Sequence, residues 1–151
     1  MVSNHVFTPI SLSPSQTAWY EWYPALAYQF STPIEISAGN QIKLTVLAWS
    51  PTAGTATIEN LSNGQVVSKS LNSTYPLCGQ NAEWIVEDYQ TGTSLVPFAD
   101  FGTVTFTNAV ATASGTQNYY PSGANITEIR QNNQVLTNVT TNSASVTIQY
   151  V

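Results

Sequence analysis

Short stretches rich in valine, isoleucine, threonine, tyrosine and phenylalanine recur along this chain, separated by glycine, proline, asparagine and serine at intervals of roughly 10 residues. No segment carries the hydrophobic period of an amphipathic helix. Strands without crossover helices form antiparallel sheets that bury one face by stacking. We therefore predict an all-β fold, an antiparallel β-sandwich of two sheets. The expected strands are 18–23, 27–31, 41–49, 55–60, 65–71, 82–89, 103–110, 125–131, 134–139 and 145–151.

Two asparagine-containing dipeptides are candidate hairpin turns. Asn63-Gly64 is the stronger signal, because both residue types accept the positive φ that tight hairpins require. Asn132-Asn133 is a weaker example of the same kind. Each is expected to join two neighbouring antiparallel strands.

The stretch 41–49 shows the alternation expected of a strand with one buried face. One face is apolar and is expected to belong to the core; it carries Ile42, Leu44, Val46 and Ala48. Trp49 lies on the other face, where it either lines a groove or packs in the core or over a sheet edge.

The string NAEWIVED at 81–88 places a carboxylate among apolar residues in a chain of which only 7% is charged. In a strand, Glu83, Ile85 and Glu87 share one face, and Ala82, Trp84 and Val86 share the other. One interpretation is that Glu83 sits among bulky neighbours at a site. The other is a carboxylate at the strand entrance with water on one side, since glutamate is mostly exposed in proteins.

The string AWYEWYP at 18–24 repeats the arrangement, with Glu21 on the same face as Trp19 and Tyr23. Together with NAEWIVED, SLVPFADFG at 94–102 and SVTIQYV at 145–151, it closely resembles the glutamic peptidases, or eqolisins, the peptidase A4 family of acid endopeptidases known mainly from fungi. The resemblance extends from about Ala18 to Val151. It implies a curved, concanavalin A-like sandwich with the site on its concave face.

The resemblance also implies residue roles. Glu83 matches the family glutamate that activates water for attack on a peptide carbonyl and then gives a proton to the leaving amine. An apolar setting would raise the pKa of such a carboxyl and suit it to acid chemistry. Trp19, Glu21 and Tyr23 match the wall of the groove that binds an extended peptide or protein substrate.

The N-terminal segment departs from the family pattern. The family's second catalytic residue is a glutamine whose amide stabilises the oxyanion, and residues 1–17 contain no string that matches its surroundings. Gln16 lies too near Trp19 to be equated with it. We therefore expect a non-matching tail over 1–17, a peptidase-like domain over 18–151 without the family's N-terminal strands, and impaired activity. An unpaired sheet edge would then favour self-association. The alternative function is a non-catalytic peptide- or carbohydrate-binding sandwich.

Composition narrows the partners. Eight acidic and three basic residues give a formal charge of −5, which does not suit nucleic-acid binding. No apolar run is long enough to cross a membrane. Four sequons agree with secretion, although residues 1–17 do not read as a signal peptide; their asparagines are Asn60, Asn72, Asn125 and Asn138. With one histidine and the single Cys78, we expect no metal site, no cofactor and no thiol or serine–histidine catalysis.

Overall fold

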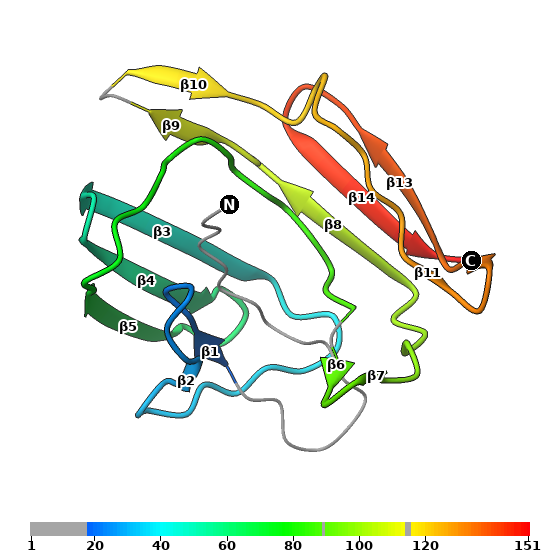
Figure 1. Cartoon of the computed structure of the whole chain (residues 1–151), viewed down its shortest axis with the longest axis horizontal. Helices are drawn as coiled ribbons and strands as arrows, with labels where there is room; N and C mark the ends of the chain where they lie inside the picture. Colours follow the sequence, from blue (N-terminus) through cyan, green and yellow to red (C-terminus); the bar gives the residue numbers. More distant parts are fainter. Residues whose placement is uncertain (1–17, 89, 114–115) are drawn as a thin grey trace. The chain divides into compact units, whose positions relative to one another are not determined.

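Antiparallel strand pairs form the regular structure of this protein (Figure 1). The computed structural model describes residues 18–88, 90–113 and 116–151. Within these ranges there is no helix, and hence none that could span a membrane. The tail predicted over 1–17 lies outside the described residues. The chain divides into two compact units, Met1–Glu83 and Trp84–Val151. The single domain predicted over 18–151 stays a prediction.

The first unit contains one three-stranded sheet and one short ladder. The sheet has the order β3-β4-β5, formed by Ile42–Ser50, Ala53–Asn60 and Gln65–Asn72. The ladder pairs β1 (Trp19–Tyr20) with β2 (Tyr28–Gln29). The strands expected at 41–49, 55–60 and 65–71 are confirmed, whereas those expected at 18–23 and 27–31 shrink to two residues each.

The core of the first unit lies on one face of this sheet. Along β4, residues alternate between buried and half-buried, and Ile58 has no exposed surface. Ile58 clusters with Ala18, Ile34 and Val67, and the half-buried residues packed against this cluster are Phe30, Ile36, Ile42 and Leu44. The core prediction is thus confirmed for Ile42 and Leu44.

The prediction of a core face is wrong for the C-terminal end of β3. Val46 is 47% exposed, Ala48 is exposed, and Trp49 is 55% exposed, so Trp49 is not a core residue either. The core cluster covers the half of the strand that holds Ile42 and Leu44, and the alternation of residue types continues beyond it. Periodicity identifies a face but not how much of it is covered.

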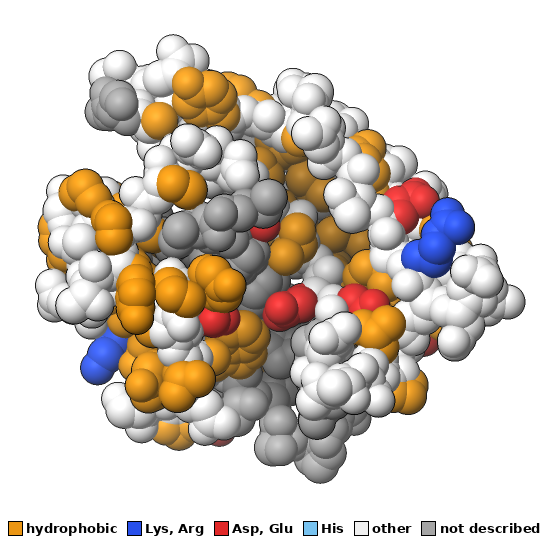
Figure 2. Space-filling model, viewed as in Figure 1, with side chains coloured by type: hydrophobic (Ala, Val, Ile, Leu, Met, Phe, Trp, Pro, Cys, Tyr) orange, Lys and Arg blue, Asp and Glu red, His pale blue; other side chains and the backbone are white. Residues whose placement is uncertain are grey.

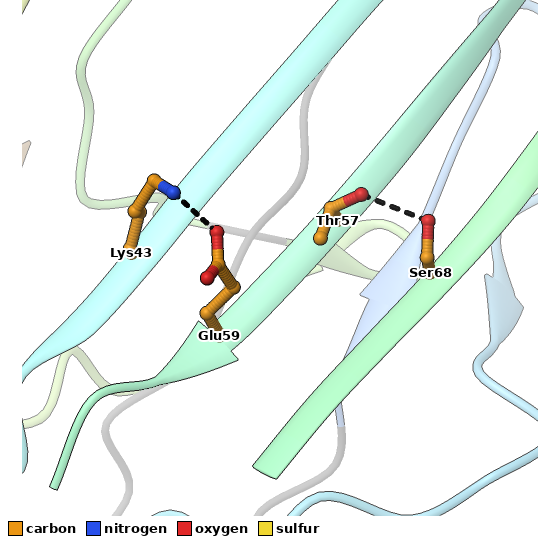
Figure 3. A network of polar contacts seen from close by, with 4 residues as sticks. All are labelled: Lys43, Thr57, Glu59 and Ser68. Carbon is orange, nitrogen blue, oxygen red and sulfur yellow. Dashed lines mark hydrogen bonds and ion pairs between the residues drawn. The ribbon is translucent and has the colours of Figure 1, made fainter. Parts of the chain in front are cut away.

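The other face of the sheet carries pairs of polar side chains (Figure 3), beside the exposed Leu47 and Val66. Lys43 on β3 pairs with Glu59 on β4, with Nζ and Oε1 2.5 Å apart. The hydroxyls of Thr57 and Ser68 lie 2.8 Å apart across β4 and β5. Such pairs are compatible with water.

The second unit is centred on the sheet β13-β14-β8. Its strands are Thr137–Thr141, Ser145–Tyr150 and Thr103–Thr107. Val146 and Ile148 on the central strand are buried, while Thr105 and Thr147 on the other face have hydroxyl oxygens 3.1 Å apart. The strands expected at 103–110 and 145–151 are confirmed, the first with an earlier end.

Short ladders complete the second unit. They pair β6 (Gln90–Thr91) with β7 (Ser94–Leu95), β9 (Ala111–Ala113) with β10 (Gln117–Tyr119), and β11 (Arg130–Gln131) with β12 (Gln134–Val135). The strand expected at 125–131 is limited to its last two residues, and the one expected at 134–139 is split between β12 and β13.

The two hairpin predictions have different outcomes. Asn132 and Asn133 have φ of 50° and 64° and form a two-residue loop between the paired Gln131 and Gln134. Asn63-Gly64 belongs to a four-residue loop between β4 and β5, in which Gly64 alone of the two has positive φ, 78°. The hairpin is confirmed in both cases, but the tight turn belongs to the weaker signal.

Candidate functional site

Glu83 lies in a segment, residues 76–88, that belongs to no strand. The strand expected at 82–89 is therefore wrong over its described residues. The predicted division into two faces persists in part, because Trp84 and Val86 are half-buried while Glu83, Ile85 and Glu87 are exposed. Ala82, which was predicted on the face of Trp84, is exposed. Glu83 is exposed, as in the alternative of a carboxylate with water on one side, although no strand begins there. Its place at a site stays a prediction.

The segment around Glu21 also departs from the predicted strand. Strand β1 ends at Tyr20, and the chain then turns through Tyr23 and Pro24, which are joined by a cis peptide bond. Trp19 and Glu21 are half-buried, whereas Tyr23 is 52% exposed. The regular alternation that placed these three side chains on one face applies only as far as Tyr20.

The best-anchored side chain of this segment is one that the alternation assigned to the opposite face. Trp22 is 6% exposed, and its indole Nε1 donates a hydrogen bond of 2.8 Å to the carbonyl oxygen of Tyr75. Its ring lies against β4 at Gly54, where an added Cβ would be 3.4 Å from Cζ3 of Trp22. The sequence analysis did not single out Trp22. The general rule that could have indicated its role is that a buried indole needs an acceptor for its N–H.

Glu21 and Trp22 together border a shallow depression on the β3-β4-β5 sheet. Its remaining lining is mostly apolar and consists of Val46, Leu47, Ala48, Gly54, Thr55, Ala56 and Leu71. Its free volume is about 10 Å³, room for about one water molecule, so it is an apolar surface beside a carboxylate and not a pocket for a side chain. Trp19, Tyr23 and Glu83 are not among the lining residues, so of the four predicted site residues only Glu21 is placed in this depression.

One side-chain hydrogen bond reaches the far end of residues 76–88, and its donor makes a second bond outside the segment. Nε2 of Gln131 donates to Oδ1 of Asp88 and to the carbonyl oxygen of Val96, both at 2.9 Å. Gln131 was not predicted as a site residue. No motif around Gln131 indicates this role, because its two acceptors are distant along the chain and become its neighbours only in the folded second unit.

The sequons differ in accessibility. Asn60 is 1% exposed, and its Nδ2, the atom that would carry a glycan, donates to the carbonyl oxygen of Glu35 at 2.6 Å and to Oδ1 of Asn40 at 2.9 Å. A glycan on this nitrogen is incompatible with that packing, so Asn60 is withdrawn as a candidate. The other three asparagines are exposed; they are Asn72, Asn125 and Asn138.

Charged side chains are sparse on the face shown in Figure 2, where hydrophobic and uncharged groups dominate. Among the described residues, no group of three or more histidine, cysteine, aspartate or glutamate side chains could hold a metal ion. The exclusion of nucleic acid, metals and cofactors rests on the sequence and stays a prediction.

Comparison with known proteins places these features in context. The model of the family described as the peptidase A4 family matches residues 7–150, beginning ahead of the predicted boundary at Ala18. Aspergillopepsin-2 of Aspergillus niger is 52% identical over 139 residues, which are 91% of this chain and 49% of that protein. Scytalidopepsin B of Scytalidium lignicola is 42% identical over 143 residues, which are 89% of this chain and 54% of that protein. The chain thus spans about half the length of these relatives.

Solved structures show the same relationship. The crystal structure of aspergilloglutamic peptidase from Aspergillus niger superposes with a TM-score of 0.83 at 52% identity, covering 91% of this chain and 81% of that one. Scytalido-glutamic peptidase with a peptide-based transition state analog gives 0.80 at 40% identity, covering 91% and 70%. An eqolisin in complex with the tripeptide Ala-Ile-His gives 0.79 at 38%, covering 91% and 69%. The predicted fold class, an all-β antiparallel sandwich, is confirmed.

Proposed function

Because this chain belongs to the peptidase A4 family, we propose that it carries the glutamic-peptidase site and that Glu83 is its general base. One observation carries the proposal: the family match over residues 7–150 includes both the Glu83 segment and the Trp19–Tyr23 segment. The expected reaction is hydrolysis of a peptide bond in acid. The match supports the family assignment, and the activity of this chain is our inference.

The chemistry needs an accessible carboxyl that exchanges its proton with water. In its ionised form, Glu83 takes a proton from water as the oxygen attacks the peptide carbonyl carbon. In its protonated form, it returns that proton to the amide nitrogen as the C–N bond breaks. The exposure of Glu83 leaves room for both the water and the peptide.

For residues 1–151 on their own, we further propose that turnover is low. They contain no string that matches the surroundings of the family's catalytic glutamine, and loss of one oxyanion donor typically lowers a rate about 100- to 1000-fold. Glu83 alone would still activate water. Measurable but slow hydrolysis is therefore the expected behaviour.

The substrate is proposed to be an extended peptide that passes Trp19, Glu21 and Tyr23. The apolar surface beside Glu21 is compatible with this proposal, and one relative binds a tripeptide in its solved structure. Secretion is proposed because three sequons are exposed, at Asn72, Asn125 and Asn138. Self-association through a sheet edge remains a proposal, supported by the exposed Val46 and Trp49 on β3.

The decisive experiment measures the release of soluble peptides from an unfolded protein substrate in moderately strong acid. Glu83→Gln should abolish release, because an amide cannot accept the proton from water. Glu128→Gln is the matched control, since Glu128 is an exposed glutamate outside the proposed site, and it should retain the wild-type rate. Equal rates in both variants would exclude Glu83 as the base.

A second function, peptide binding without turnover, is favoured by the exposed Tyr23 and the depression beside Glu21. It predicts that a labelled peptide binds to the protein and is recovered intact. Trp19→Ala should weaken that binding. Carbohydrate binding is the other alternative, because the exposed Trp49 could stack on a sugar ring; retention on a glycan array, lost in Trp49→Ala, would favour it instead.

A further inference from the structure

Residues 76–88 carry Glu83 but have no strand ladder to fix their position. A catalytic carboxylate must nevertheless be held closely, because a misplacement of about 1 Å can cost on the order of 100-fold in rate. Side-chain hydrogen bonds reach both ends of this segment. Trp22 bonds to the carbonyl oxygen of Tyr75, just before the segment, and Gln131 bonds to Asp88, its last residue.

The upstream contact belongs to the first unit and is rigid at its donor. Trp22 is almost fully buried, and its ring packs against the backbone at Gly54. The acceptor side is tied to the same part of the sheet, because the backbone N–H groups of Ser73 and Leu77 donate to the carbonyl oxygens of Thr52 and Pro51 at 2.9 and 2.7 Å. The indole therefore fixes the chain where it leaves the sheet toward Glu83.

The contact at Asp88 belongs to the second unit, and its donor is the side-chain amide of Gln131, both of whose N–H groups are used. Gln131 spends both hydrogens of Nε2, one on Asp88 and one on Val96, so it joins two chain segments to β11. Gln131 is itself held by pairing with Gln134 across the two-residue turn. A donor on such a short hairpin has little freedom to follow a moving segment.

We propose that Trp22 and Gln131 are positioning residues for residues 76–88. Within the first unit, Trp22 holds the chain where the segment that carries Glu83 begins, and within the second unit, Gln131 holds Asp88, where the segment ends. Neither residue takes part in the chemical step, although Trp22 also borders the depression beside Glu21. The catalytic part of this inference rests on the proposed function, while the holding of the segment does not. The two parts are therefore tested by separate measurements.

The first measurement is amide hydrogen exchange, followed by mass spectrometry of peptides that cover 76–88. Trp22→Phe keeps the ring and removes the N–H, and Gln131→Met keeps the length and removes both donors. Loss of one such bond should raise local exchange about tenfold. The rise should occur before Glu83 in the first variant, and around Asp88 in the second.

Two controls isolate these donors. Tyr75→Phe retains the carbonyl oxygen that accepts from Trp22, and Gln134→Met alters the exposed glutamine that pairs with Gln131. Both should leave the exchange of 76–88 unchanged. Unaltered exchange in Trp22→Phe and Gln131→Met would overturn the inference, and the Gln131 pair decides alone if Trp22→Phe does not fold.

The second measurement is peptide hydrolysis. Mispositioning of Glu83 in Gln131→Met should lower kcat about tenfold while KM stays nearly constant. Because a smaller fraction of folded protein would also lower the apparent kcat at constant KM, the rate is referred to the folded fraction measured by urea unfolding. Faster exchange with an unchanged kcat would overturn the catalytic part. A wild-type protein without any hydrolysis would overturn the proposed function and that part with it, whereas the exchange result would still decide whether the two residues hold the segment.

Discussion

Strand β4 and residues 81–88 have similar sequence patterns and different structures. In β4, buried and half-buried residues alternate along all of Ala53–Asn60. In residues 83–88, exposed and half-buried residues alternate, and the segment belongs to no strand. Strand β4 has β3 on one side and β5 on the other, which pair with it along its whole length.

The difference shows that alternation of side chains and pairing of backbones are separate properties. Alternation states which side chains share a face. A strand in a sheet also requires a neighbouring strand that satisfies its backbone donors and acceptors. Pairing on both sides places β4 in the middle of a sheet, where one of its faces is buried in the core. The sequence of 81–88 reports the first property only.

The largest expected effect compares one substitution in both regions. Ile58→Ala in β4 should lower the free energy of unfolding by about 3 to 4 kcal/mol, because Ile58 is fully buried and its loss leaves a cavity. Ile85→Ala should lower it by less than about 1 kcal/mol, because that side chain is 38% exposed. Urea unfolding of both variants measures the two values. Equal losses would mean that 81–88 is packed as tightly as β4.

The sequence predicted the long ladders and not the short ones. Strands β3, β4, β5 and β14 have enough residues for a period of two to be visible, and they were expected within a few residues of their bounds. The two-residue ladders carry no period, and the positions of their partners depend on the folded chain. The prediction of a strand at 82–89 was wrong for a different reason. The period of two is clear in this stretch, but the sequence does not show whether another strand pairs with it.

The site shows the same limit. Glu83 and Glu21 stood out because carboxylates are rare here, and Trp19 and Tyr23 were found through the family strings. Trp22 was visible only as another aromatic residue, and its role depends on the carbonyl oxygen of Tyr75, 53 positions away. Contacts of this range follow from tertiary structure, which a single sequence does not display.

The next largest effect on the free energy of unfolding compares the polar residues that end the two regions, Asn60 and Asp88. Asn60 ends β4, and its buried side chain also accepts from the backbone N–H of Ser62 at 3.0 Å. Asn60→Ala leaves several buried groups without partners and should cost about 2 to 3 kcal/mol. Asp88→Ala removes one acceptor of Gln131 at a half-buried position and should cost about 1 kcal/mol. Thermal or urea unfolding compares them, and a larger loss for Asp88→Ala would reverse the ranking of the two regions.

The smallest expected effect tests whether the polar face of β4 contributes to the free energy of unfolding, beyond the contribution of its buried face. Lys43 and Glu59 form an ion pair across β3 and β4, with side chains that are 55% and 26% exposed (Figure 3). Water and salt screen such a pair, so a double-mutant cycle with Lys43→Met and Glu59→Gln should give a coupling free energy of about 0.2 to 1 kcal/mol. The cycle is measured by urea unfolding at low and high salt, and the coupling should fall at high salt. A coupling as large as the Ile58 effect would place the stability of β4 in its polar face. The expected small value leaves the ladder and the buried face as the source of the difference between β4 and the segment that carries Glu83.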